Sequence, residues 1–153
     1  MPIEIGQEAP DFELKDSDNN PVRLSSFRGD KPVLIVFYPF TFSGLCEGEL
    51  CRLRDDYSVF EDKGVQILAI SCNARHAQGL WREQQGYQFP VLTDFWPHGA
   101  TAQAYGVFND QLGCAQRYSF LVGTDGTVLD VFGGDDIGAI REASRYDEAL
   151  AKL

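Results

Sequence analysis

Two predominantly apolar runs, separated by a stretch with helical periodicity, limit the folds that this chain can adopt. The runs occupy residues 32–38 and 65–71, and both are long enough for one strand. Apolar runs of this kind are typical of strands buried on both faces, as in parallel sheets covered by helices. The stretch between them repeats apolar side chains at helical spacing: Leu50, Leu53, Tyr57 and Phe60.

The rest of the pattern extends this strand–helix–strand unit on both sides. We expect an N-terminal hairpin (12–14 with 22–24), helices at 44–61, 74–85, 100–105 and 138–151, a short strand at 89–92, and two strands at 118–122 and 128–132. The last two strands are joined by a Gly-Thr-Asp-Gly-Thr turn, a strong hairpin signal. This order predicts one α/β domain over residues 1–153, with a mixed central sheet that closes on an antiparallel hairpin.

Charge and hydropathy exclude several classes of partner. The net charge is −10, from 13 basic and 23 acidic residues, and such a surface repels nucleic acid. No apolar run approaches the roughly 20 residues that cross a bilayer, and no signal-peptide pattern precedes the first strand. We therefore expect no membrane association and a cytoplasmic location. In a reducing compartment, the four cysteines indicate chemistry or packing rather than structural disulfides.

Cys46 lies where the strand at 32–38 passes into the helix that begins near residue 44. A cysteine in the first turn of a helix is close to the positive end of the helix dipole and to free backbone N–H groups, and both favour the thiolate. Ser43 can cap this helix or contact a bound oxygen atom. Pro39 and Gly44 shape a tight approach to the helix. The position indicates a nucleophile.

The spacing Pro39-x-x-x-Ser43-x-x-Cys46 resembles the peroxiredoxin signature P-x-x-x-T/S-x-x-C. The segment at 9–12 is similar to the family's N-terminal A-P-D-F, and those at 94–100 and 104–109 resemble the alkyl hydroperoxide reductase E subgroup. The resemblance covers essentially the whole chain. It implies a thioredoxin-like fold, a homodimer, and reduction of hydrogen peroxide, organic hydroperoxides and peroxynitrite without a cofactor.

The resemblance also implies a role for each site residue. The Cys46 thiolate would attack the distal peroxide oxygen, with the Ser43 hydroxyl and the Cys46 N–H aligning the O–O bond. Arg117 would stabilise the thiolate and the charge that develops on the peroxide. Glu49 would fix the fork of this arginine through a bidentate pair. On local grounds alone, Arg117 could equally form a surface salt bridge, and Glu49 could be a solvated helix carboxylate.

Cys51 follows Cys46 at the spacing of the resolving cysteine in the bacterioferritin comigratory protein (PrxQ) peroxiredoxins. Along an intact helix this spacing is about 500° of rotation and ~7.5 Å of rise. The two Cα atoms would then lie roughly 8–9 Å apart, beyond the disulfide limit of about 7 Å. A resolving role for Cys51 therefore requires the first turns to unwind. The alternative is a bystander thiol packed beside Leu50 and Leu53.

The remaining thiols and rings carry weaker signals. We expect Cys72 and Cys114 to be structural, and Phe95 and Trp96 to serve in packing or in a dimer interface. The two histidines, His76 and His98, and the scattered cysteines form no compact ligand set, so no metal is expected. The chain ends at Leu153, just after the last predicted helix, so we also expect no C-terminal extension with a partner-subunit resolving cysteine.

Two other functions compete with peroxide reduction. A thiol–disulfide oxidoreductase fits the thioredoxin-like order, but that chemistry favours C-x-x-C, whereas four residues separate Cys46 from Cys51. A non-enzymatic redox sensor would be oxidised once without being recycled. The reductant of a peroxidase also stays open, with thioredoxin, a mycoredoxin and a low-molecular-weight thiol as candidates.

Overall fold

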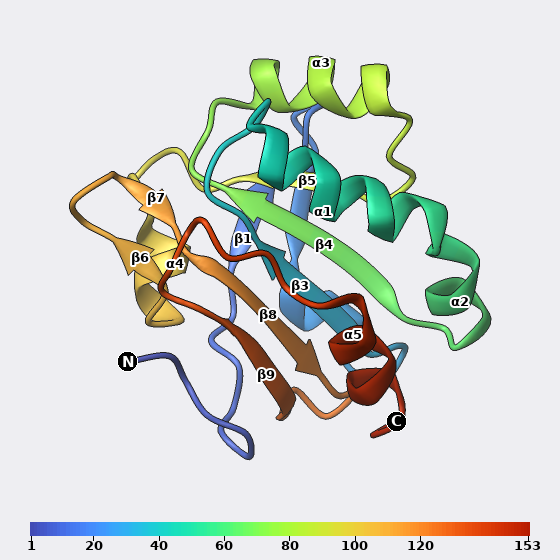
Figure 1. Ribbon diagram of the computed structural model, residues 1–153. Coiled ribbons are helices and arrows are strands. Elements are labelled where there is room, and N and C mark those ends of the chain that lie inside the picture. The colour runs from blue at the N-terminus through green and yellow to red at the C-terminus, as the bar shows by residue number, and fades with distance from the viewer.

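A computed structural model describes all 153 residues and contains a seven-stranded mixed sheet with helices on both faces (Figure 1). The strand order is β2-β1-β5-β4-β3-β8-β9, and β6 and β7 form a separate two-stranded sheet. The strands are β1 (Glu13–Lys15), β2 (Pro21–Arg23), β3 (Val33–Phe37), β4 (Gln66–Ser71), β5 (Val91–Thr93), β6 (Phe108–Asn109), β7 (Cys114–Ala115), β8 (Arg117–Val122) and β9 (Val128–Gly134). The helices are η1 (Leu24–Phe27), α1 (Gly44–Asp55), α2 (Tyr57–Asp62), α3 (Arg75–Gln85), α4 (Ala100–Ala104) and α5 (Ala143–Leu150).

The register of the central strands gathers the ends that matter for the site. β3 and β4 run parallel, with Phe37 opposite Ile70, and β4 and β5 run parallel beside them. β8 runs antiparallel to β3, with Val36 opposite Ser119. The carboxyl ends of β3 and β4 and the amino end of β8 therefore meet at one edge of the sheet. The β3–α1 loop and Arg117 both lie at this edge.

Each face of the sheet carries its own core. One cluster joins β3 and β4 to side chains of α1, α2, α3 and α5, and Cys46 belongs to it. The other joins them to α4 and to the N-terminal segments. Each fully buried Leu or Phe in these clusters contributes about 1.5–3 kcal/mol. No helix of the chain has both the length and the apolar character that spanning a membrane requires.

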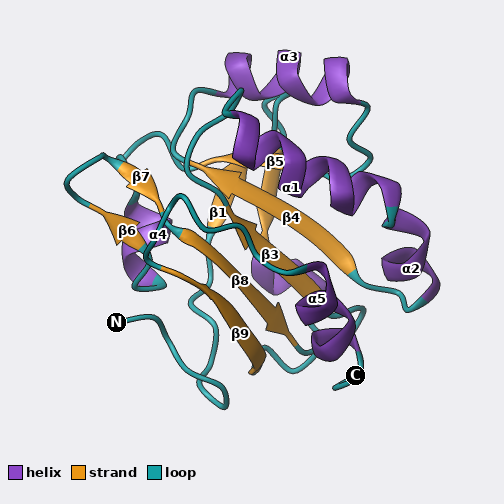
Figure 2. Cartoon of the chain, in the orientation of Figure 1, coloured by secondary structure: helices purple, strands orange, loops and turns teal.

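The α/β class, the mixed sheet and the N-terminal hairpin confirm the predictions, but three elements differ. The expected helix at 44–61 is two helices that meet at Asp56, a turn that directs Phe60 into the core. The last helix begins at Ala143 rather than at 138, because residues 135–142 form a loop (Figure 2). Residues 108–109 and 114–115, where no strand was predicted, form the short strands β6 and β7, and Cys114 lies in β7.

Candidate active site

The loop between β3 and α1 is held in place by one side chain at the end of β3 and one from the segment that follows β4. The Asn73 side chain accepts a hydrogen bond from the Thr41 backbone N–H at 2.8 Å, and Thr41 shares another with the Tyr38 hydroxyl at 2.9 Å. Phe42 has a φ of +70°, a left-handed conformation that non-glycine residues seldom adopt. Such conformations persist where the surrounding structure enforces them. The loop thus delivers the start of α1 at a fixed angle.

Cys46 sits in the first turn of α1, and its side chain is completely buried. The backbone N–H groups of Gly44, Leu45 and Cys46 donate to no protein acceptor, as is usual for the start of a helix. Ser43 is the N-cap residue, yet its hydroxyl makes no capping hydrogen bond. Both the free N–H groups and the free hydroxyl can therefore hydrogen-bond an oxygen atom brought to the thiol.

A buried carboxylate between two buried arginines lies on the same helix, one turn further on. Arg141 forms a bidentate pair with Glu49, from Nε to Oε2 and from Nη2 to Oε1, both at 2.9 Å. The backbone N–H of Arg141 also donates to Oε2, at 2.8 Å. Arg117 Nη1 donates to Oε1 at 2.5 Å. All three side chains are at least 95% buried, with exposures of 5% for Glu49, 2% for Arg117 and 1% for Arg141.

This cluster carries an unbalanced positive charge. Burial alone raises the pKa of Glu49, but hydrogen bonds and charge from Arg141, and then charge from Arg117, outweigh burial and lower it. Glu49 is therefore ionised at neutral pH, and two guanidinium groups share one carboxylate. Burying a charge without a partner is costly. A thiolate at Cys46 is the anion that would balance the cluster.

Two nitrogen atoms of the Arg117 guanidinium are hydrogen-bonded within the protein, and the third is free. Its Nε donates to the Ile137 carbonyl at 2.6 Å, while Nη2 donates to no protein group. Gly133 lies opposite the start of β8 with a φ of +128°, and a Cβ there would overlap the Arg117 carbonyl oxygen. Glycine is thus required for the close approach of β9 that fixes the Arg117 backbone. The Nη2 N–H groups remain available to a thiolate or a substrate oxygen.

Comparison with known proteins identifies the family of this chain. A model of the AhpC/TSA family matches residues 5–131. Alkyl hydroperoxide reductase E of Mycobacterium tuberculosis is 43% identical over 151 residues, which cover 99% of this chain and 98% of that protein. Peroxiredoxin Bcp of Bacillus subtilis is 30% identical over 135 residues, or 84% of each chain. The crystal structure of peroxidoxin BcpB from M. tuberculosis matches with a TM-score of 0.86 and 31% identity, covering 98% of this chain and 96% of that one.

The chain belongs to the AhpC/TSA family and is a peroxiredoxin. Peroxiredoxins are thiol-dependent peroxidases, so the predicted enzyme class and the thioredoxin-like fold are both confirmed. The site geometry differs from the prediction in one respect. The bidentate partner of Glu49 is Arg141, and Arg117 makes a single contact because its Nε is taken by the Ile137 carbonyl.

Sequence reasoning about this peroxiredoxin missed Arg141. The helix predicted at 138–151 would have contained this residue, and nothing in the local pattern marks it as buried. The structure places it in the loop before α5, with its side chain turned into the core. The one available signal was Gly138, which together with Asp135 and Asp136 is typical of a loop rather than a helix start.

Cys51 lies on the same unbroken helix as Cys46, and all four cysteines are free thiols. The half-buried Cys51 thiol donates to Gln85 Oε1 at 3.5 Å and lies 3.6 Å from the Tyr87 hydroxyl oxygen. Gln85 also donates to Glu47 Oε1 at 3.0 Å, and the same oxygen accepts the Trp81 indole N–H at 2.9 Å. We call these polar contacts between α1 and the α3–Tyr87 segment the α1–α3 clamp. They restrain the part of α1 that lies between the two cysteines.

Cys72 and Cys114 are buried near the same edge of the sheet. Burial, followed by the nearby Asp94 and Cys114, raises the pKa of Cys72 to about 12. Burial, followed by the nearby Cys46, also raises the pKa of Cys114. Because only the thiolate is a good nucleophile, both thiols are inert in this conformation at neutral pH.

The expected interface residues and the histidines lie outside the cluster of Cys46 and the arginines. Phe95 is 50% exposed and Trp96 is 84% exposed, so neither is a core residue. His98 is exposed and within hydrogen-bond distance of two backbone carbonyls, those of Phe95 and Gly113. No group of three or more His, Cys, Asp or Glu side chains is arranged to hold a metal ion.

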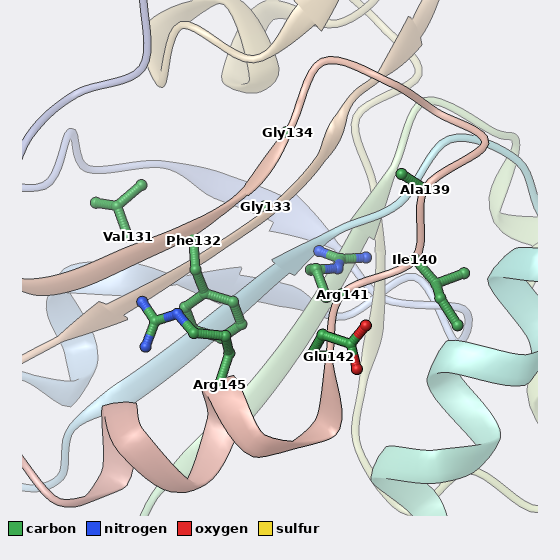
Figure 3. A pocket seen from close by; sticks show the side chains of 9 residues that line it. All are labelled: Val131, Phe132, Gly133, Gly134, Ala139, Ile140, Arg141, Glu142 and Arg145. Carbon is green, nitrogen blue, oxygen red and sulfur yellow. The ribbon is translucent and has the colours of Figure 1, made fainter.

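A pocket of about 360 Å³, which Arg141 helps to line, lies between β9, the loop before α5 and α5 itself (Figure 3). Arg145 lies over the Phe132 ring in it, with the guanidinium carbon 4.6 Å from the ring centroid. Neither Cys46 nor Glu49 lines this pocket. It is therefore not the place where a peroxide meets the thiol.

Proposed function

We propose that Cys46 is the peroxidatic nucleophile of this enzyme. The observation that carries the proposal is the buried cluster of two arginines and one carboxylate beside a thiol at a helix N-terminus. The thiolate attacks the distal oxygen of ROOH, a S–O bond forms, and the O–O bond breaks. The leaving RO⁻ takes a proton to become an alcohol or water, and Cys46 becomes a sulfenic acid.

The neighbouring groups divide the remaining work. The free Ser43 hydroxyl and the free Cys46 N–H hold the peroxide in line with the thiolate. The free Nη2 of Arg117 stabilises the charge that develops on the peroxide oxygens. Pro39, buried between β3 and the loop, shapes the approach to α1, and Glu49 orients both arginines. The buried position of Cys46 means that a small movement of the loop must admit the substrate.

Recycling of the sulfenic acid has two routes. In the first, the Cys51 thiol attacks the Cys46 sulfur, a disulfide forms and water leaves; an external dithiol then reduces the disulfide. In the second, an external thiol attacks directly. The first route requires α1 to unwind and the α1–α3 clamp to open, because both thiols lie on one intact helix. Thioredoxin, a mycoredoxin and a low-molecular-weight thiol are the candidate reductants.

The substrate range and the cellular setting follow from the same chemistry. We propose hydrogen peroxide, organic hydroperoxides and peroxynitrite as substrates, because the groups assigned to bind the peroxide would contact only its O–O unit. Free thiols operate in a reducing compartment such as the cytoplasm. The exposed Phe95 and Trp96 support a homodimer formed through this end of a single-domain chain, since exposed aromatic residues are enriched at protein interfaces.

Replacement of the thiol tests the central assignment. Cys46→Ser should abolish hydroperoxide reduction in an assay coupled to dithiothreitol oxidation, whereas Cys114→Ser should retain it. Stopped-flow kinetics of the reduced wild type should show oxidation by hydrogen peroxide far faster than that of free cysteine. Retained turnover in Cys46→Ser would refute the assignment.

A further inference from the structure

A pair of hydroxyl groups holds Arg141 on the edge that does not face Glu49. Arg141 Nη1 donates to the Ser119 hydroxyl oxygen at 3.1 Å and to the Phe37 carbonyl at 2.8 Å. The Ser119 oxygen lies 3.0 Å from the Tyr146 hydroxyl oxygen, within hydrogen-bond distance. Ser119 is fully buried on β8, whereas Tyr146 belongs to α5, far from the thiol in the sequence. The hydroxyl of an α5 residue thus reaches the cluster that contains Glu49.

The Tyr146 ring is fixed by aromatic packing. Its centroid lies 4.8 Å from that of Phe132 on β9 and 6.2 Å from that of Phe60 on α2, both in edge-to-face geometry. Such pairs restrict the orientation of a ring as well as its position. The hydroxyl at the end of the ring is therefore a stationary anchor rather than a mobile surface group.

The Tyr146 hydroxyl acts, through Ser119, on the Arg141 guanidinium, most of whose N–H groups are hydrogen-bonded. Four of the five N–H donors of Arg141 are used, by Glu49, Phe37 and Ser119, and one N–H on Nη2 remains. A guanidinium is planar, so a shift at Nη1 is transmitted to Nη2 on the same plane. Hydrogen bonds in such a buried chain also polarise one another.

We propose that Tyr146, acting through Ser119, is a positioning residue for peroxide reduction at Cys46. The hydroxyl pair sets the plane of Arg141, Arg141 sets Glu49, and Glu49 Oε1 holds Nη1 of Arg117. The inference rests on the proposed function of Cys46. It adds that the C-terminal helix, which contributes no group to the thiol itself, tunes the thiol's reactivity.

The test removes the hydroxyl and keeps the ring. Tyr146→Phe should lower the second-order rate constant for Cys46 oxidation by hydrogen peroxide about three- to tenfold, the effect of one lost hydrogen bond. The pH midpoint of fast thiol alkylation by iodoacetamide should move upward. Tyr57→Phe is the matched control, because Tyr57 is a partly buried tyrosine that packs against the same core and forms no side-chain hydrogen bond. It should behave like the wild type in both measurements.

Ser119→Ala tests the pair from its other end and covers the case in which Tyr146→Phe fails to fold. It should give a loss of similar size, and the double variant should lose little more than either single variant, because both changes break one chain. A wild-type rate and pH profile in Tyr146→Phe or in Ser119→Ala would overturn the proposal, even with a lower melting temperature. If the wild type itself reacted no faster than free cysteine, the proposed function would fail first.

Discussion

At the scale of single residues, the three guanidinium nitrogen atoms of Arg117 have different environments. Nε donates to the Ile137 carbonyl, Nη1 donates to Glu49, and Nη2 is free. A lysine at this position would keep the positive charge, but its ammonium lacks the planar fork and cannot make these contacts together. Charge and geometry can therefore be separated by one substitution.

We predict that Arg117→Lys lowers the rate of Cys46 oxidation by about 10- to 100-fold, the range seen when an aligned, charge-assisted donor is lost. Stopped-flow measurements with hydrogen peroxide would give this rate directly. Arg23→Lys is the control, because the Arg23–Glu13 pair is about half exposed and far from α1 in the sheet order. A wild-type rate in Arg117→Lys would mean that only the charge is needed.

Apart from Arg117, which entered through the family resemblance, the site residues that the sequence brought to attention belong to one short segment. Ser43, Cys46 and Glu49 lie within two turns of one helix, so their proximity follows from local spacing. Arg141 has no such neighbour. Its place depends on a loop that crosses the end of β3, and long-range contacts of this kind leave no periodic trace in a sequence.

At the scale of elements, the pairing of α1 with α3 restrains the segment between the two cysteines. Gln85 of α3 donates to Glu47 and accepts from Cys51, so it ties both residues of α1 to α3. These two hydrogen bonds must break when the first turns of α1 unwind. Periodicity predicted both helices, and α3 ends at Gln85 as predicted, followed by Gly86 in the left-handed conformation. The bridge could not be predicted, because it depends on how the two helices cross.

We predict that Gln85→Ala accelerates formation of a Cys46–Cys51 disulfide about two- to fivefold after peroxide treatment, since one or two hydrogen bonds no longer oppose unwinding. Mass spectrometry of alkylated samples taken over time would follow the disulfide. Gln84→Ala, the same substitution at the exposed neighbouring position, should match the wild type. Equal rates of disulfide formation in all three proteins would show that the α1–α3 clamp does not limit the unwinding of α1.

At the scale of the whole molecule, buried titratable groups make the free energy of unfolding depend on pH in opposite directions. Glu49 has a lowered pKa, which gives stability that is present above its usual value near 4.5 and is lost as the pH falls through the lowered value. Cys72 has a pKa raised by burial from 9.0 to about 12, which gives stability that is present below pH 9 and is lost as the pH rises toward 12. Burial likewise raises the pKa of Tyr38 and Tyr105 above 10.0.

We predict that the free energy of unfolding, measured by urea titration in the presence of a reductant, is flat from about pH 5 to 9 and falls on both sides. Cys72→Ala should make the alkaline loss shallower, because Cys114 and the buried tyrosines then supply the loss that remains, and it should leave the acid side unchanged. The comparison between the two sides controls for a general loss of stability in the variant. If the alkaline loss of unfolding free energy were equally steep in both proteins, Cys72 would not stay neutral in the native state.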